Sequence, residues 1–221
     1  MPPARRRFGP QQIGSFWESV SPKLGRVVRL QSRLEYYNWI LVEADAEIES
    51  FCERPRWIEV GPGWSVPEMW VQFRSGRQQL REIKRSTDLE FDRNGLIANR
   101  QIVIQQRWCQ ENGIGHIVLT EIDLLANPVK LENWRRILRY LCQGGGMDEN
   151  LKSAVLEFVT SKIDADLREI RHRFLRFDES AIDRCVFKLL QEGLFNSDLD
   201  ARPLAQSSRF SKHDEQESFQ S

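Results

Sequence analysis

Three residues in the first half of the chain, Glu68, Glu82 and Lys84, have types and spacing suited to hydrolytic chemistry. Glu82 and Lys84 are two residues apart on a predicted strand, where side chains at i and i+2 share one face about 6.5–7 Å apart. Two carboxylates bind a hard divalent cation such as Mg²⁺ or Mn²⁺ through oxygen. The ammonium of Lys84 could orient or activate a water, or offset charge on a phosphate under attack.

A hairpin would bring these three side chains together. The sequence predicts strands over residues 65–73 and 77–85, joined at Arg74-Ser75-Gly76. Ile83 is apolar and should face the opposite side, into the core. An alternative stays open, because Glu-x-Lys pairs are common on solvated strands: these residues alone equally fit a surface hairpin of alternating charge.

Further elements must position the hairpin. Hydrophobic spacing and turn residues predict helices over 32–44, 97–112 and 130–142, and strands over 56–60 and 115–119. The last strand is expected to continue through Thr120-Glu121-Ile122-Asp123. From the first predicted helix, the order of elements is α-β-β-β-α-β, which predicts the α/β class.

A triple glycine, Gly144-Gly145-Gly146, is the best domain boundary in the sequence. Three helical patterns follow it, over residues 149–160, 164–176 and 179–192, and then a turn and short apolar pieces. Three helices and a short hairpin are the parts of a winged helix, a helix-turn-helix variant.

The predicted organisation therefore has four parts. They are a basic flexible lead-in (1–20), an α/β domain (21–145), a winged-helix domain (147–210) and a polar tail (211–221).

The net charge is zero, with 32 basic and 32 acidic residues, which excludes a bulk polycation that coats nucleic acid. The charge is unevenly distributed: residues 1–146 hold 21 basic and 17 acidic side chains, and residues 147–221 hold 11 and 15. In the last predicted helix, Arg184 and Lys188 face several acids. A winged helix that reads DNA usually has a basic third helix, so we expect this domain to dock protein.

Other classes are excluded by simple features. No apolar run reaches the roughly 18 residues that a membrane span needs. The four cysteines are far apart and never form Cys-x-x-Cys, which favours reduced thiols and a cytoplasmic location. With three scattered histidines a structural zinc site is not expected, and no phosphate loop of the Gly-x₄-Gly-Lys-Ser/Thr type is present.

The run Pro67-Glu68…Glu82-Ile83-Lys84 resembles the PD-(D/E)-x-K nuclease signature. That resemblance implies a restriction-endonuclease-like core with a mixed sheet, and metal-dependent hydrolysis of phosphodiesters. Over about residues 20–210, the order of motifs resembles the TnsA family, the endonuclease subunit of the heteromeric transposase of Tn-seven-like transposons. The matching elements are Ser32-x-x-Glu35, Phe51–Pro55, Pro67-Glu68, Glu82-Ile83-Lys84, Thr120-Glu121, Asn133, and Ala181–Leu194 for the winged helix.

The resemblance implies a subunit that cleaves the 5′ ends of a transposon in double-stranded DNA, in a bacterial cytoplasm where it associates with the nucleoid during transposition. Its implied partners are TnsB, a DDE-type transposase that cleaves and joins the 3′ ends, and TnsC, an AAA+ ATPase. A stand-alone nuclease of the same fold, and a catalytically degenerate scaffold that only bridges partners, are the alternatives.

Carried over by position, the catalytic residues are Glu35, Glu68, Glu82 and Lys84. The implied ligands of Mg²⁺ or Mn²⁺ are Glu68, Glu82 and the backbone carbonyl of Ile83, with Glu35 as a further ligand or helper. Ser32-x-x-Glu35 also fits a capping box, in which the glutamate only caps a helix. The family usually has aspartate where this chain has Glu68, and the extra methylene moves the carboxylate by about one bond length in sites that tolerate about 0.5 Å. We favour an active enzyme.

The remaining candidates concern substrate contact. We expect DNA contacts from four arginines: Arg26, Arg29, Arg33 and Arg85. Arg5-Arg6-Arg7 could also contact phosphates, although such runs are commonly solvated tails. Trp64 and Trp70 could stack near a substrate or be core residues, Gln105 and Gln106 fit a solvated helix face better than a cleft, and His116 fits a hydrogen-bonded strand residue.

Overall fold

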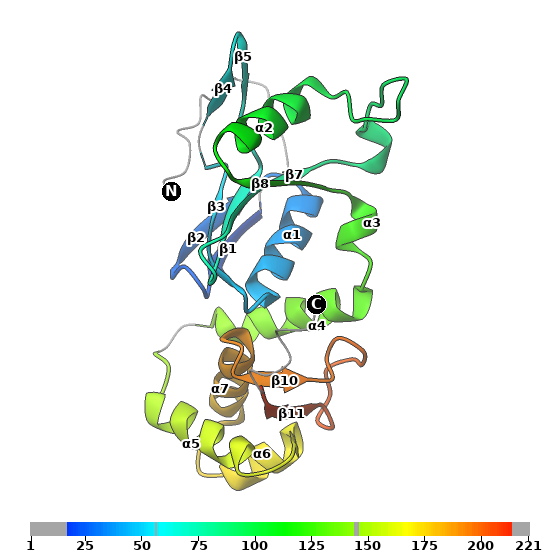
Figure 1. The fold of residues 1–221 in the computed structure, drawn as a ribbon. Coiled ribbons are helices and arrows are strands. Elements are labelled where there is room, and N and C mark those ends of the chain that lie inside the picture. The colour runs from blue at the N-terminus through cyan, green and yellow to red at the C-terminus, as the bar shows by residue number, and fades with distance from the viewer. Residues whose placement is uncertain (1–16, 56, 144–145, 214–221) are drawn as a thin grey trace. The chain divides into compact units, whose positions relative to one another are not determined.

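The computed structural model describes residues 17–55, 57–143 and 146–213 (Figure 1). These residues group into two units: the first runs to Ala126, and the second begins at Asn127 and also includes residues 44–46. The chain is mixed α/β, as the sequence predicted. No helix in the described ranges is long and apolar enough to cross a membrane, and all four cysteines are free.

A four-stranded mixed sheet forms the centre of the first unit (Figure 1). Its strands lie in the order β3 (Ile48–Glu53), β6 (Met69–Phe73), β7 (Gln78–Ile83) and β8 (Gly115–Leu119). The first three are antiparallel neighbours, and β8 runs parallel to β7. A parallel neighbour requires a crossover, which here contains the helix α2 (Arg100–Glu111).

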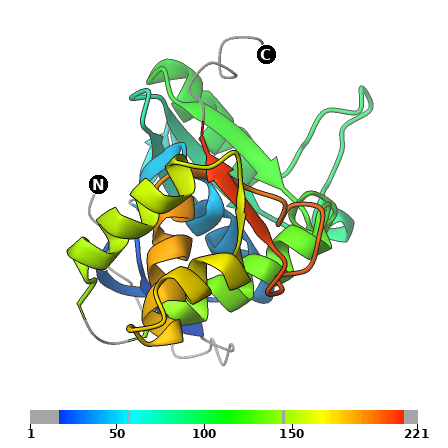
Figure 2. The ribbon, with the colours of Figure 1, turned by 90° about the horizontal axis from the view of Figure 1, so that it is seen from below.

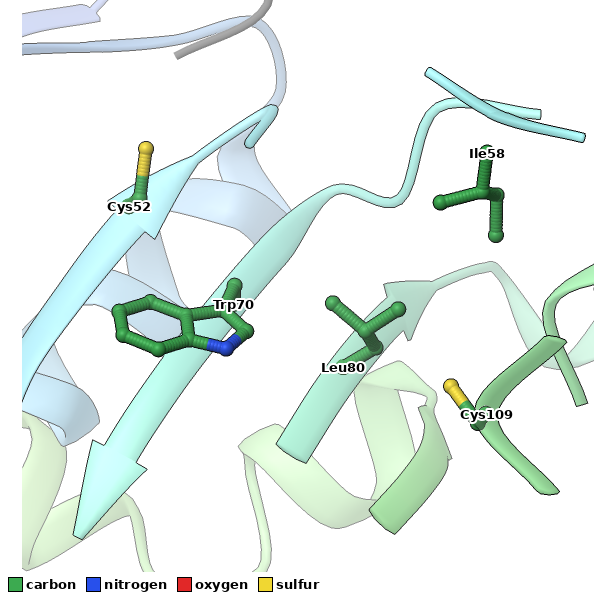
Figure 3. Close-up of a cluster of buried hydrophobic side chains, with 5 residues drawn as sticks. All are labelled: Cys52, Ile58, Trp70, Leu80 and Cys109. Carbon is green, nitrogen blue, oxygen red and sulfur yellow. The ribbon is translucent and has the colours of Figure 1, made fainter. Parts of the chain in front are cut away.

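Helices α1 (Arg33–Ala44) and α2 contact opposite faces of this sheet. On one face Cys52, Trp70 and Leu80 pack with Cys109 of α2 and with Ile58 (Figure 3). The other face carries Met69 and Arg81, and both contact Asn38 of α1: the Asn38 amide donates to Met69 Sδ at 3.2 Å and accepts from Arg81 at 3.1 Å. Ile83 is buried, as expected of a residue on the face opposite Glu82.

The predicted strand over residues 65–73 is shorter than expected, and the predicted strand over residues 56–60 pairs outside the central sheet, as β4 (Ile58–Val60). β4 and β5 (Gly63–Ser65) form a hairpin of their own, and β6 begins only at Met69. Pro67 has no N–H to donate to a ladder, so pairing stops between β5 and β6. The hairpin packs tightly on α2, because a Cβ on Gly63 would lie 2.6 Å from Ile104 Cδ1.

Part of the predicted flexible lead-in is ordered. β1 (Trp17–Ser21) and β2 (Arg26–Leu30) form an antiparallel hairpin, and Trp17 stacks on Tyr36 of α1 with ring centroids 5.0 Å apart. That stacking and the burial of Val28 and Leu30 give the hairpin a core to pack on. The rest of the lead-in, with Arg5–Arg7, lies outside the described residues.

The strand expected to run through Asp123 ends at Leu119. Thr120 caps a short helix, α3 (Glu121–Leu124), through a capping box with Asp123. A short 3₁₀ helix, η1 (Ser86–Asp88), follows β7, and Glu121 accepts hydrogen bonds from the backbone and the hydroxyl of Ser86. The reciprocal bonds of the cap favour the helical turn over further extension.

The second unit contains four helices and a small sheet (Figure 2). Its elements are α4 (Pro128–Leu141), α5 (Glu149–Thr160), β9 (Ala165–Asp166), α6 (Leu167–Arg173), α7 (Glu179–Gln191), β10 (Phe195–Ser197) and β11 (Arg209–Lys212). The three strands pair in the order β10-β11-β9. Residues 211 and 212 of the predicted tail therefore belong to a strand, and those from 214 onward lie outside the described ranges.

The units divide before α4, whereas the sequence placed the boundary at the triple glycine, of which only Gly146 is described. The reason is that α4 packs on the helices that follow it. Tyr140 makes an edge contact with Phe187 of α7 at 5.3 Å. Asn133, which is buried, donates to the carbonyls of Leu199 and Arg202 and accepts from the Leu204 N–H, all at 2.7 Å.

Candidate active site

Glu68 and Glu82 lie at the end of the β6–β7 ladder. Met69 and Arg81 are the last pair of that ladder, and Glu68 and Glu82 are the next residues along the chain on its two sides. Glu82 belongs to β7, whereas Glu68 directly precedes β6. The two carboxylates lie close enough for their repulsion to raise the pKa of Glu68.

Lys84 and Glu82 form an ion pair at this end of the sheet. Lys84 Nζ lies 2.9 Å from Glu82 Oε1 and donates to Gln101 Oε1 at 3.3 Å. Glu82 is completely buried, whereas the Lys84 side chain keeps 24% of its exposure. The ammonium thus reaches the surface while its partner carboxylate remains shielded from water.

Arg54 holds Glu68 in place, and sequence reasoning missed it. Its backbone N–H donates to the Glu68 carbonyl at 2.9 Å, and its guanidinium Nη1 lies 3.2 Å from Glu68 Oε2 and 2.9 Å from Gln31 Oε1. Arg54 has φ of 46°, in the left-handed region, and it is the one non-glycine residue there among those the structure describes. Such a conformation costs about 1–3 kcal/mol and persists where surrounding contacts impose it. A signal existed in the sequence, since Arg54 directly precedes Pro55.

Gln105 is buried against Glu82, so the predicted solvated position is wrong for this residue, although Gln106 is exposed as expected. Ile102, Gln105 and Cys109 form the inward stripe of α2 at helical spacing. Gln105 Nε2 lies 2.7 Å from Glu82 Oε2 and 2.9 Å from the hydroxyl of Ser65, and its Oε1 lies 2.9 Å from His116 Nε2. His116 is the hydrogen-bonded strand residue that the sequence predicted.

Glu35 caps α1 and also lies near the other acids. Its N–H donates to Ser32 Oγ at 3.1 Å, and its carboxylate accepts the Gln31 N–H at 3.0 Å. The capping interpretation of Ser32-x-x-Glu35 is therefore correct in form, with Gln31 as the donor to the carboxylate. Burial raises the pKa of Glu35, and repulsion from Glu82 adds to that shift.

The three carboxylates share one electrostatic environment. Burial raises the pKa of Glu68 to about 8, repulsion from Glu35 and Glu82 adds to the shift, and attraction to Arg54 and Lys84 opposes it. A cluster of acids with too little positive charge to balance it is typical of functional sites. A bound cation would relieve this repulsion.

The donor atoms at the site suit a hard cation. Among residues 17–55, 57–143 and 146–213, no group of three or more His, Cys, Asp or Glu side chains is placed to hold a metal ion. The expected set needs only two such side chains, Glu68 and Glu82, with the Ile83 carbonyl, and all of these donors are oxygens, as Mg²⁺ prefers. Glu82 Oε1 is buried and accepts no hydrogen bond from the part of the chain that the structure describes, although it is in ion contact with Lys84, whereas Oε2 accepts from Gln105. On these grounds the residues present fit the cation.

The arginines expected at DNA differ in their engagement. Arg26 forms a two-bond pair with Glu53, both at 2.7 Å, and Arg29 pairs with Glu18 at 2.8 Å. Arg33, in the first turn of α1, and Arg85, next to Lys84, are exposed. Arg33 and Arg85 are thus better placed than Arg26 to contact a phosphate near the site.

The two tryptophans separate into the two roles considered for them. Trp70 is a core residue, and its indole N–H donates to Gln78 Oε1 at 3.1 Å. Trp64 is 60% exposed on the β4–β5 hairpin, where its ring centroid lies 4.2 Å from that of Trp57. Of these two residues, Trp64 is the one that a partner or a substrate could contact.

No family model matches the chain, and no curated protein sequence matches it significantly.

Proposed function

We propose that this chain is a metal-dependent DNA endonuclease of the TnsA type, the subunit that hydrolyses the 5′-end phosphodiester at transposon ends. The observation that carries the proposal is the group of Glu68, which directly precedes β6, and Glu82 on β7, whose charges repel each other, with Lys84 in ion contact with Glu82. The order of the elements also supports the proposal. Helix α1, the antiparallel strands, the crossover helix α2 and the parallel strand β8 follow the order that the PD-(D/E)-x-K resemblance implies.

In the proposed reaction, a water oxygen bonds to phosphorus while the bond from phosphorus to the 3′ oxygen breaks. The products are a 3′-hydroxyl and a 5′-phosphate. Glu68, Glu82 and the Ile83 carbonyl would hold Mg²⁺ or Mn²⁺. When bound, this cation would act as a Lewis acid on the phosphate and lower the pKa of the attacking water.

Each protein group has a distinct role in this proposal. Lys84, part-exposed and part-shielded, can donate to a phosphate oxygen and offset the charge that develops there. Arg54 orients Glu68 through its ion pair. Glu35 serves as a further ligand or helper, and its charge adds to the raised pKa of Glu68.

Glu68 stands where the family usually has aspartate, and the contact with Arg54 compensates for its greater length. The longer side chain extends the carboxylate by about one bond length, and the guanidinium of Arg54 holds it at 3.2 Å. Such a hold keeps a longer ligand in one rotamer, which supports an active enzyme over a degenerate scaffold.

For the second unit we propose a winged helix that docks protein, with TnsB or TnsC as the partner. Helices α5, α6 and α7 followed by the β10–β11 hairpin have the order of that motif. In α7, the third of these helices, every residue from Ile182 to Gln191 is buried or only partly exposed. A helix that reads the major groove presents several exposed side chains, so sequence-specific DNA binding by α7 would contradict this part of the proposal.

The test is a strand-cleavage assay on transposon-end duplexes with the partner proteins and Mg²⁺ or Mn²⁺. Wild type should cut the 5′ ends, and Lys84→Ala should lose activity by at least about 100-fold, while the control Arg107→Ala, which removes an exposed ion pair on α2, should not. Equal cleavage by wild type and Lys84→Ala would refute the catalytic assignment. Cleavage without any partner would favour a stand-alone nuclease, and no cleavage under any condition would favour a scaffold.

A further inference from the structure

The buried amide of Gln105 has a fully determined orientation. Its Nε2 lies within hydrogen-bond distance of Glu82 Oε2, at 2.7 Å, and of Ser65 Oγ, at 2.9 Å. Glu82 is in ion contact with Lys84 through Oε1 and accepts at Oε2, so the Gln105 atom that faces it must be the donor nitrogen. Both amide protons are therefore used, and Gln105 Oε1 is the acceptor on the side of His116.

This orientation also determines the proton position on His116. Since Gln105 Oε1 can only accept, His116 Nε2 must carry a proton and donate it over 2.9 Å. Burial lowers the pKa of His116 to about 4, which agrees with a neutral ring protonated at Nε2. A chain of hydrogen bonds thus runs from His116 on β8 through Gln105 on α2 to Glu82 on β7.

We propose that Gln105 is a positioning residue of the candidate active site: it fixes Glu82 Oε2, so that Oε1 stays in ion contact with Lys84 and could hold a cation. This inference rests on the proposed function. Ser65 and His116 in turn hold the amide, so three elements, β5, α2 and β8, determine the position of one carboxylate.

Gln105 would act on the cation through Glu82, by a hydrogen bond that fixes the orientation of this ligand. Removal of such a partner typically lowers metal affinity or activity by about 10- to 100-fold, because the ligand can then rotate. Gln105 touches neither the cation nor the substrate in this scheme. Its substitution should therefore change cation affinity and kcat and leave KM for DNA nearly unchanged.

The experiment uses the full chain with MnCl₂ as the probe. Mn²⁺ affinity is measured by titration calorimetry, the His116 ring by ¹⁵N NMR, and cleavage in the assay above. Gln105→Leu should weaken Mn²⁺ binding by about 10- to 100-fold, lower kcat and shift the His116 Nε2 resonance. The matched control is Gln106→Leu, an exposed neighbour on the same helix, which should change none of these.

A milder variant keeps the test valid if Gln105→Leu does not fold. Ser65→Ala removes one of the two acceptors of the amide and should weaken Mn²⁺ binding by only a few-fold, about 2- to 5-fold, with the His116 resonance displaced less. Wild-type Mn²⁺ affinity in both Gln105→Leu and Ser65→Ala, in a protein that still cleaves, would overturn the inference and leave the proposed function standing. A wild type that neither binds Mn²⁺ nor cleaves would overturn the proposed function and, with it, the role given to Gln105.

Discussion

Raising the pH should destabilise the metal-free protein, and Glu68 should account for much of the effect. Burial, with repulsion from Glu35 and Glu82, raises the pKa of Glu68 from 4.5 to about 8, against the opposing charges of Arg54 and Lys84. The unfolded chain releases this proton near its ordinary pKa, whereas the folded chain keeps it until about pH 8. Between these values the folded state binds more protons, so the free energy of unfolding falls as pH rises.

The size of the effect follows from the linkage relation. Each unit of pH between the two pKa values lowers the free energy of unfolding by about 1.4 kcal/mol per proton. From about pH 6 to about pH 9, Glu68 alone should remove about 2–3 kcal/mol, and the loss should level off once the folded carboxyl has ionised. Glu35, whose pKa is also raised, adds a loss of the same sign.

Urea unfolding in EDTA, followed by tryptophan fluorescence, measures this loss. The signal reports mainly on the first unit, because six of the seven tryptophans precede residue 127. Glu68→Gln should reduce the decline by about 2–3 kcal/mol and leave the part due to Glu35. The control Glu59→Gln changes an exposed glutamate of β4 and should keep the wild-type slope. Equal slopes for wild type and Glu68→Gln would refute the burial argument.

Three further predictions concern other parts of the chain. Mg²⁺ in place of EDTA in the urea experiment should raise the midpoint of unfolding more at about pH 9 than at about pH 6, because the ionised carboxylates bind the cation. An equal rise at both pH values would argue against these ligands. Arg54→Gly should relieve the strain of the left-handed φ and also lose the ion pair to Glu68, so the free energy of unfolding should change by about 1 kcal/mol at most. Cleavage should fall by about tenfold, because Glu68 is then less well oriented. Unchanged cleavage would show that Arg54 has no role in the site. Asn133→Leu should destabilise the second unit by about 2–4 kcal/mol in urea unfolding followed by circular dichroism, because three backbone groups lose their buried partner. The control is Glu132→Leu, which changes an exposed residue of α4. Equal stability of the two variants would refute the role given to Asn133.

Local sequence patterns determined most elements of this protein. The helical spacing over residues 32–44 and the alternation over residues 77–85 predicted α1 and β7 almost to their ends. Ile83 was predicted to be buried from its place between two charged neighbours. These predictions succeed because periodicity of apolar residues depends on neighbours in the chain, which the sequence displays directly.

What the sequence misjudged involves partners distant in the chain. Gln105 has a polar side chain on a mostly polar helix, and only the packing of α2 over β7 buries it against Glu82, 23 residues away. The domain boundary was placed at the glycines, but Asn133 bonds to residues 66 to 71 positions later and draws α4 into the second unit. Residue type and spacing in the sequence thus identify Glu68, Glu82 and Lys84 as candidates. Only the tertiary structure brings Arg54 and Gln105 to them and raises the pKa of Glu68, because burial and interactions between distant charges exist only once the chain has folded.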